Sequence, residues 1–581
     1  MNAGRPVYQV FEGPSLLAPF RAIAVRFDYR GIFAAPPTPL TASRLAALSG
    51  IVPDALIDQV RSSPALENAA SLMAGLAVAI QEQPGPLDLR TRVRLAPNGE
   101  TLVAVEFTSA KGGLLAMKLA LDLARHAQGC SELSPRQLTN QVREVLRAQR
   151  ALQPNQTTRV MLKAARHLDI PHYRLIDSRT LICYGQGEKS LLFSGAASQF
   201  DSALGTAIQN SKQDTSRFVS MMGYPVPEQI LAVDEQAARA AADRLGYPLA
   251  VKPLAEGQGR GVTSDIRNLE AMLAAFRRAE AYSPRSVIIE RHIPGFDHRI
   301  TVSRGRVIGA ICRMPARVIG DGNTPIAGLI ARENKDRDPD LKRQGLLKDI
   351  EIDDNLVQTL ANDNMTLASI PAHGQVVYLR SNANISTGGT FQDVLERMHS
   401  DNLEMAVDIA RAMRLDTAGI DFMTRDAAAP WWKEGAIIEV NTTPGVLEDL
   451  ALDVLKGRFG DGRGARIPTT LVITDDHQGN HSPGEGYVSP DVTSLGGKQR
   501  QPEGGTVYRR CLALLVDPAC RSMTVSIGRK AIVREGLPLD RFDRCLIDTR
   551  SPSGQAILAA RARGAPLYQL LEQHAGALEF L

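Results

Sequence analysis

Three oxygen-bearing side chains lie in two neighbouring apolar stretches, at 418–422 and 437–441. Glu439 and Asn441 alternate along a β-branched run, so a strand would present both on one face. Asp421, on the strand before, could meet them across a ladder. Such oxygen ligands suit the Mg²⁺ that accompanies ATP. The alternative is a strand whose polar side chains only face solvent, and these stretches alone do not exclude it.

A second group surrounds Lys252, which ends an apolar strand at 249–253. It precedes a loop with Gly257, Gly259 and Gly261. Glycines let backbone N–H groups approach phosphate oxygens, and a nearby lysine neutralises their charge. Such a loop alone is more often a plain turn. The order of these groups along the chain favours a phosphate site.

That order resembles the ATP-grasp ligases. The resemblance implies that Lys212 and Lys252 bind ATP phosphates, that Glu290 ends the strand beside adenine and that Asp297 meets the ribose. It implies ATP and Mg²⁺, with two ions expected, as cofactors. The expected nucleotide residues are Lys212, Lys252, Gly257, Gln258, Gly259, Gly261, Glu290 and Asp297, and the expected metal ligands are Asp421, Glu439 and Asn441.

Longer motifs at 11–15, 313–322 and 374–390 are similar to those of the cyanophycin synthetases, over nearly the whole chain. This resemblance implies contacts to the γ-phosphate or substrate. The expected catalytic residues are Arg313, Arg380, Ser386 and Thr387, and the expected substrate residues are Thr157, Thr158, Arg299, Gly388 and Gly389.

The chain departs from that family in four places. Its relatives carry a second, Mur-type ligase module opened by a phosphate loop, and here 472–481 has no lysine in a Gly-rich cradle. The stretch 71–75 lacks the zinc motif that many relatives have. Gln258 replaces a loop histidine, and Ser216 replaces a lysine. One ligase centre is therefore expected, together with a noncatalytic Mur-like remnant.

The expected fold is α/β (α+β), with an ATP-grasp domain over 157–465. A mixed α/β domain over 1–156 precedes it, and the truncated Mur-ligase-like domain over 466–581 follows. The polar stretch 148–158 predicts a linker, 477–505 a long mobile loop and 512–516 a strand. The charged run 332–348 is interpreted as a solvated helix and loop.

Composition excludes several classes of protein. The net charge of +4 over 581 residues, without interleaved aromatic residues, gives no indication of nucleic-acid binding. Six dispersed cysteines indicate reduced thiols. The stretch 1–6 lacks the apolar core of a signal peptide, and the sequence contains no apolar run of about 18 residues. No membrane contact and a cytoplasmic location are therefore expected.

The predicted function is ATP-dependent amide formation through an acyl phosphate. The substrates expected are amino acids or dipeptides such as β-aspartyl-arginine, with a growing peptide polymer as a further partner. A homo-oligomer, dimer or tetramer, is expected from the resemblance. Three alternatives stay open: a ligase for another amino acid or peptide, a noncatalytic nucleotide-binding scaffold that regulates a full-length partner, and a phosphotransferase.

Overall fold

The computed structural model describes residues 6–34, 36–61, 66–83, 85–176, 180–254, 261–343, 347–380, 383, 387–477, 482–502 and 505–581. The chain forms two compact units. Unit 1 combines Met1–Phe193 with Arg458–Leu581, and unit 2 is Ser194–Gly457. The three-domain division expected from the sequence stays a prediction.

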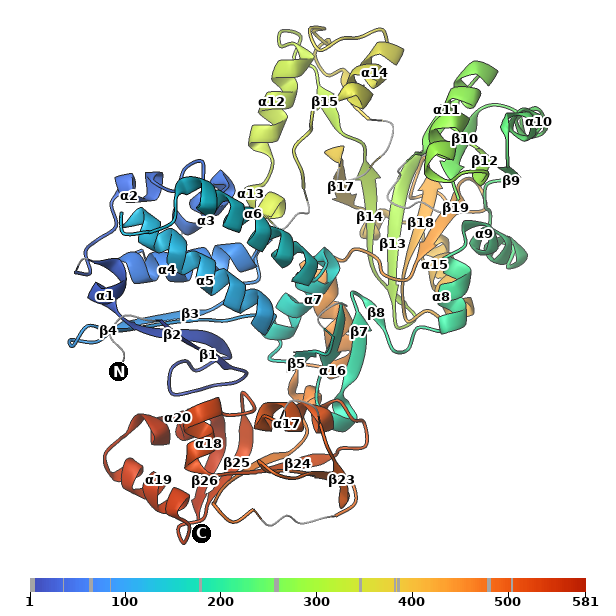
Figure 1. Cartoon of the computed structure of the whole chain (residues 1–581). Coiled ribbons are helices and arrows are strands. Elements are labelled where there is room, and N and C mark those ends of the chain that lie inside the picture. Colours follow the sequence, from blue (N-terminus) through green and yellow to red (C-terminus); the bar gives the residue numbers. More distant parts are fainter. Residues whose placement is uncertain are drawn as a thin grey trace. The chain divides into compact units, whose positions relative to one another are not determined.

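Unit 1 begins with an antiparallel sheet in the order β1-β2-β4-β3. Helices α4 and α5 pack together and cover this sheet (Figure 1). α4 starts at a capping box in which Asn68 accepts backbone hydrogen bonds, and its run of Ala, Leu and Met is buried. The elements are β1 (Val7–Phe11), β2 (Ala22–Asp28), α4 (Ala69–Gln81), β3 (Thr91–Leu95), β4 (Glu100–Val105) and α5 (Ala110–Ala127). Shorter helices are α1 (Tyr29–Phe33), α2 (Ala42–Ala46) and α3 (Asp54–Arg61).

The linker expected at 148–158 is mostly helical. Helix α6 (Pro135–Leu152) begins at a capping box on Ser134 and buries Leu138 and Val142. Helix α7 (Gln156–His167) begins directly after the N-cap Asn155. Only three residues, 153–155, join these helices. The strands β5 (His172–Arg174), β6 (Leu181–Tyr184) and β7 (Leu191–Ser194) follow.

The last part of unit 1 is a sheet in the order β23-β22-β21-β24-β20-β25-β26. The prediction of a mobile loop at 477–505 is wrong in part, because this stretch contains three strands. They are β21 (Glu485–Val488), β22 (Thr493–Leu495) and β23 (Lys498–Arg500). These strands are too short to show a period of two, and pairing at the sheet edge forms them. The other strands are β20 (Thr469–Ile473), β24 (Ser522–Ile527), β25 (Phe542–Ile547) and β26 (Ala575–Phe580).

The strand expected at 512–516 is also wrong, because this stretch belongs to helix α17 (Val507–Leu515). Thr506 caps the helix, and Val507, Cys511, Leu514 and Leu515 are buried at helical spacing. Because Leu512 to Val516 are all apolar, the helical spacing of the buried residues could not be recognised in the sequence. The helix expected after Ser553 is α19 (Pro552–Ala562), with α18 (Arg529–Glu535) before it and α20 (Pro566–His574) after it.

Unit 2 is organised around an antiparallel sheet in the order β17-β14-β13-β18-β19. Helix α15 (Ser400–Ala412) packs on one face. That face buries Ile300, Ile420, Phe422 and Val440 in a common core. The strands are β13 (Phe296–Ser303), β14 (Arg306–Met314), β17 (Thr390–Asp393), β18 (Thr417–Thr424) and β19 (Ala436–Asn441).

A smaller antiparallel sheet of unit 2 has the order β11-β10-β12-β9 (Figure 1). Helices α10 (Glu235–Leu245) and α11 (Leu269–Tyr282) pack on it. Its strands are β9 (Gln229–Ala232), β10 (Leu249–Pro253), β11 (Thr263–Ile266) and β12 (Val287–Arg291). Helices α8 (Ala203–Gln209) and α9 (Lys212–Met221) pack together, and α9 also contacts β19.

A third sheet of unit 2 pairs β15 (Arg317–Ile319) with β16 (Val376–Tyr378). Helices α12 (Ile326–Asp336), α13 (Pro339–Arg343) and α14 (Asp354–Asn362) lie in the same part of the sequence. A core formed by Val318, Leu329, Leu356 and Val377 joins this sheet to α12 and α14.

Candidate active site

Strand alternation gathers the polar residues on the face of the large sheet opposite α15. Ile300, Ile420 and Val440 point into the apolar core, as do alternate residues of their strands. The residues next to them in the sequence, Arg299, Asp421 and Glu439, point to the opposite face. They lie side by side, because the register pairs Arg299 with Asp421 and Asp421 with Glu439. The sequence prediction that Asp421 meets Glu439 across a ladder is confirmed. A bulge at Ile438 lies between Glu439 and the strand residues before it.

Asp421 is the centre of this polar cluster. It is 2% exposed and accepts hydrogen bonds from two arginines. Arg299 donates from Nη2 at 3.0 Å and also from Nε, and Arg313 donates from Nη2 at 2.6 Å. Arg313 Nη1 also lies 3.2 Å from Asp297 Oδ2. Asn441 Nδ2 lies 3.5 Å from Asp421 Oδ2.

The carboxylates of the cluster differ in acidity. Arg299 and Arg313 lower the pKa of Asp421 against the opposing effect of burial. Burial, followed by the charge of Asp421, raises the pKa of Glu439 and raises that of Asp297 to about 6. The face therefore holds closely spaced negative groups that its two arginines only partly neutralise.

This donor set fits a hard divalent cation. Asp421, Glu439 and Asn441 offer only oxygen ligands, and positive charge would offset the repulsion that raises the pKa of Glu439. Across the described residues, no three His, Cys, Asp or Glu side chains gather as a metal site. The expected set contains only two carboxylates, and the Asn441 amide is its third member.

Two lysines and a glutamate form a second group in unit 2. Lys252 Nζ lies 2.6 Å from Glu290 Oε2, with the two side chains 12% and 10% exposed. Lys212, at the start of α9, donates to the carbonyl of Pro253 at 3.0 Å. The charge of Lys212 also lowers the pKa of Glu439 against the effect of burial. Lys212 therefore interacts both with β10, which carries Lys252, and with Glu439 beside Asp421.

The glycine loop is described only at its last residue. Gly257, Gln258 and Gly259 lie outside the described residues, as does Ser386. Gly261 has a φ of +71°, and a Cβ there would lie 2.8 Å from the Tyr282 ring. Backbone conformation and space both require glycine at this end of the loop.

Arg380 is buried, but its partners belong to a different part of unit 2. Its Nη1 and Nη2 donate to the Asp353 carboxylate at 2.6 and 2.9 Å. No contact in the described part of the chain joins it to Asp421. No motif in the sequence marks Asp353 as the partner of Arg380.

The solvated interpretation of 332–348 is wrong at Arg337, whose side chain is 2% exposed. Its Nη2 donates to the Gly388 carbonyl at 2.6 Å. Gly388 has a φ of +87°, and a Cβ there would lie 2.8 Å from Ile350 Cγ1. Arg337 thereby holds the expected substrate segment at Thr387, Gly388 and Gly389. A charge count along the sequence gave no signal for this single buried guanidinium.

Thr157 and Thr158 lie in unit 1, in the first turn of α7. The Asn155 side chain accepts the backbone N–H of Thr158 at 2.8 Å. The Thr158 side chain is buried, and its hydroxyl has no hydrogen-bond partner among the described residues. Their expected substrate role stays a prediction.

Gly419 makes room for Arg299 beside Asp421. A Cβ at Gly419 would lie 2.8 Å from Arg299 Cδ and 2.9 Å from Pro444 Cβ. We expect Gly419→Ala to lower the free energy of unfolding by about 1–3 kcal/mol through overpacking. Urea unfolding measures this, with Gly445→Ala as the matched control because no atom lies within 4 Å of its added Cβ. Equal stabilities of the two variants would show that Arg299 is not held in this position.

Asp297 predicts a specific pH dependence of stability. Its pKa rises from 3.8 to about 6 in the folded protein, so folding favours the protonated carboxyl. This contribution is complete below pH 3.8 and is lost as the pH rises through 6. We expect Asp297→Asn to gain stability over the native protein between pH 4 and 7, by roughly 2–3 kcal/mol in all. Urea unfolding across this range measures the difference, and a flat or falling difference would contradict the raised pKa.

The sequence around this site is similar to that of known proteins. The carbamoyl-phosphate synthase L chain ATP-binding domain family matches residues 211–302, which contain Lys212, Lys252 and Glu290. Cyanophycin synthetase from Trichormus variabilis is 30% identical over 472 residues, covering 77% of this chain and 52% of that protein. The chain is therefore similar to the cyanophycin synthetases and contains a segment that matches an ATP-binding domain. It spans about half the length of these curated relatives.

Other comparisons give similar results. The cyanophycin synthetase of Geminocystis herdmanii is 30% identical over 499 residues, covering 81% of this chain and 56% of that protein. The crystal structure of a bifunctional glutathione synthetase from Pasteurella multocida aligns with a TM-score of 0.41 and 23% identity. It covers 60% of this chain and 52% of that one. In the described part of the chain, no helix combines the length and apolar character needed to cross a bilayer.

Proposed function

We propose that this protein is an ATP-dependent carboxylate-amine ligase that forms an amide bond through an acyl phosphate. The observation that carries the proposal is the shared polar face of Asp421, Glu439 and Asn441, with Lys212 beside Glu439. The match of residues 211–302 to an ATP-binding domain supports the same assignment.

The proposed reaction has two steps. A substrate carboxylate oxygen attacks the γ-phosphorus of ATP, which forms the acyl phosphate and releases ADP. An amine then attacks the acyl carbon, loses a proton and expels inorganic phosphate as the amide forms. Both steps concentrate negative charge, so fixed cations lower the barrier.

The side chains of unit 2 divide this work. Lys212 and Lys252 neutralise the ATP phosphates, and release of Lys252 from Glu290 would free its ammonium group for this contact. Arg299 and Arg313 face the reacting carboxylate and γ-phosphate from the Asp421 side of the sheet. Glu290 and Asp297 accept hydrogen bonds from adenosine. The segment Ser386, Thr387, Gly388 and Gly389 supplies hydroxyl and backbone donors to the substrate, and Arg380 serves the substrate or γ-phosphate.

Magnesium belongs to this proposal as ATP's companion ion. Asp421, Glu439 and Asn441 would hold it, and two ions are expected. When bound, the ions supply charge neutralisation for the phosphates. Arg299 and Arg313 would then turn from Asp421 toward the substrate anions.

The substrates proposed are aspartate- and arginine-derived peptides, in first place β-aspartyl-arginine, which would be joined into a cyanophycin-like polymer. The similarity to proteins named cyanophycin synthetase supports a cyanophycin-like product. Residues 466–581 are proposed as a noncatalytic Mur-like remnant, since 472–477 ends a strand without a phosphate-loop lysine. A homo-oligomer is part of the proposal.

Incubation with ATP, Mg²⁺ and candidate dipeptides or amino acids tests the function, with ADP release and product mass as readouts. We expect ADP and a lengthened peptide with β-aspartyl-arginine. ADP formed only with free amino acids would overturn the dipeptide assignment and favour the other ligase. Nucleotide binding without substrate-dependent ADP would favour the regulatory scaffold, and a phosphorylated product would favour the phosphotransferase.

A further inference from the structure

A pocket of unit 1, which the proposed ligase chemistry does not use, is lined by four cationic side chains and by the apolar residues Leu87, Pro154, Leu162 and Ile182. Arg21, Lys163, Arg166 and Arg174 line it together with His172 and Thr108. No Asp or Glu is among its lining residues, all of which are described. The basic groups come from three places in the chain: Arg21 precedes β2, Lys163 and Arg166 lie on α7, and His172 and Arg174 lie on β5. The loop before α5 supplies Thr108.

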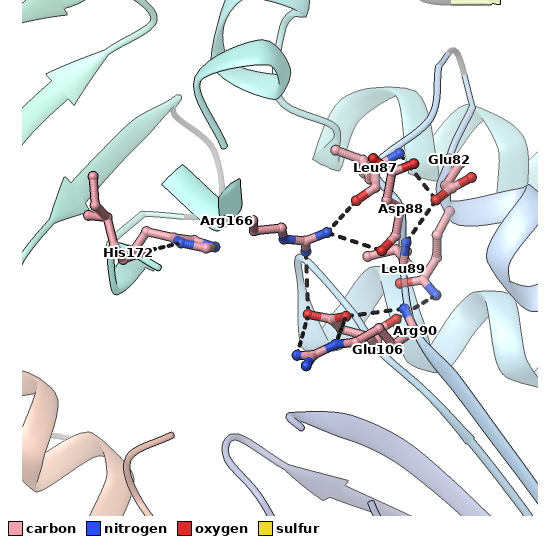
Figure 2. A network of polar contacts seen from close by, with 10 residues as sticks. Glu82, Leu87, Asp88, Leu89, Arg90, Glu106, Arg166 and His172 are labelled. Atoms are coloured by element: carbon pink, nitrogen blue, oxygen red, sulfur yellow. Dashed lines mark hydrogen bonds and ion pairs between the residues drawn. The ribbon is translucent and has the colours of Figure 1, made fainter. Parts of the chain in front are cut away.

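Carboxylates near the pocket are already engaged. Glu106 is 3% exposed and accepts hydrogen bonds from Arg90 at 2.9 Å and from Arg166 at 3.4 Å (Figure 2). Burial opposes the low pKa of Glu106, and these arginines lower it. Asp88 lies 3.4 Å from Lys163. Glu82 is a third carboxylate of this network and interacts electrostatically with Arg166 and Asp88. Glu82, Asp88 and Glu106 together carry fewer negative charges than the positive charges of Arg21, Arg90, Lys163, Arg166 and Arg174.

Arg166 is held rigidly toward this pocket. Its guanidinium donates to the carbonyl oxygens of Leu87 and Asp88 as well as to Glu106 (Figure 2). Burial and the charges of Arg21 and Arg90 lower its pKa, against the effect of Glu106. A guanidinium fixed in this way is preorganised for an oxyanion.

Arg21 is the cation of the pocket that has no direct ion pair in the described part of the chain, although the Glu106 carboxylate attracts it. It makes no hydrogen bond or ion pair with the part of the chain that the structure describes, and its guanidinium lies 5.9 Å from the Phe107 ring centroid. Its charge nevertheless acts on Glu106, Arg166 and His172. A partly buried arginine that repels its neighbours is stabilised by an external anion.

His172 reports on the charge of this pocket. Its Nδ1 lies 3.1 Å from the Ile170 carbonyl, which can only accept, so Nδ1 carries the proton of the neutral ring. Burial and the charges of Arg21 and Arg166 lower its pKa to about 3. A bound anion would reverse the effect of these charges and raise the pKa.

We propose that this pocket of unit 1 binds a single oxyanion group, with Arg21 and Arg166 as its main ligands. The group would belong to inorganic phosphate or to a carboxylate of a small metabolite. Planar guanidinium groups bind both chemistries through paired N–H donors. The site would operate without ATP, so its failure and that of the ligase proposal are distinguishable.

Histidine NMR on the full chain, labelled at the imidazole ring and without nucleotide, tests the site. Inorganic phosphate and succinate are titrated separately at constant ionic strength, with chloride as the reference anion. We expect a saturable shift of the His172 ring signals at pH 7, where phosphate and succinate both carry negative charge. Saturation by phosphate alone identifies phosphate as the ligand chemistry, and saturation by succinate alone identifies a carboxylate.

The variants Arg21→Gln and Arg26→Gln form a matched pair. Arg26 lies on β2 and is exposed, away from the lining residues. We expect Arg21→Gln to weaken anion binding about tenfold or more, and Arg26→Gln to leave it unchanged. A His172 signal that neither anion moves beyond the chloride reference would overturn the proposal. Equal binding by the two variants would also overturn it.

Discussion

Glu439→Gln is expected to reduce substrate-dependent ADP release about a hundredfold or more while preserving the fold. The substitution removes one negative charge from the proposed metal and phosphate site, where electrostatic stabilisation has its largest effect. Burial and the charge of Asp421 raise the pKa of Glu439, so the folded protein gains little from its ionised form. Thermal unfolding should therefore show no loss of stability.

Glu396→Gln is the control for this change, because Glu396 is an exposed acid of the same unit. Initial rates at saturating ATP and Mg²⁺ compare the two variants. Full ADP release by Glu439→Gln would remove Glu439 from the active site. A loss of both activity and thermal stability would instead assign it a structural role.

Asp421→Asn is expected to have a large effect on stability as well as on activity. Asp421 is 4% exposed at its side chain and pairs with Arg299 and Arg313, which are 14% and 17% exposed. Its removal leaves the buried guanidinium of Arg299 without its ion-pair partner and leaves Arg313 with Asp297 alone. Breaking buried pairs of this kind costs about 3–5 kcal/mol. Urea unfolding at pH 7 measures the loss.

A second substitution separates pairing from a general loss of packing. If the cost arises from the unpaired guanidinium groups, Arg299→Gln combined with Asp421→Asn should lose less stability than the sum of the single changes. Additive losses would contradict the central place of Asp421 in this ion-pair cluster. The double variant should still lack ligase activity.

The sequence predicted the central geometry because strand alternation is local. Glu439 and Asn441 alternate within one strand, and a single β-ladder brings Asp421 opposite Glu439. The two arginine partners of Asp421 were predicted as site residues, but their contact with it depends on the pairing of β13, β14 and β18, which local spacing does not encode.

Contacts between distant residues and very short strands leave no local pattern in the sequence. The burial of Arg337 depends on Gly388 and Lys348, which approach it only in the folded chain. The strands at 485–500 form through sheet pairing, and the apolar run at 512–516 fits a strand as well as the helix α17. Local sequence patterns do not predict which distant residues or strands will pair in the folded chain.

The most direct test of the central claim is the transfer of oxygen from the substrate. A dipeptide labelled with ¹⁸O in its carboxylates is incubated with ATP, Mg²⁺ and the protein. Mass spectrometry then measures the ¹⁸O content of the released inorganic phosphate. Formation and aminolysis of an acyl phosphate moves one carboxylate oxygen into each phosphate. We predict one ¹⁸O atom per phosphate with the native protein and a loss of turnover in Glu439→Gln. Phosphate released during amide formation without ¹⁸O would contradict the acyl-phosphate mechanism.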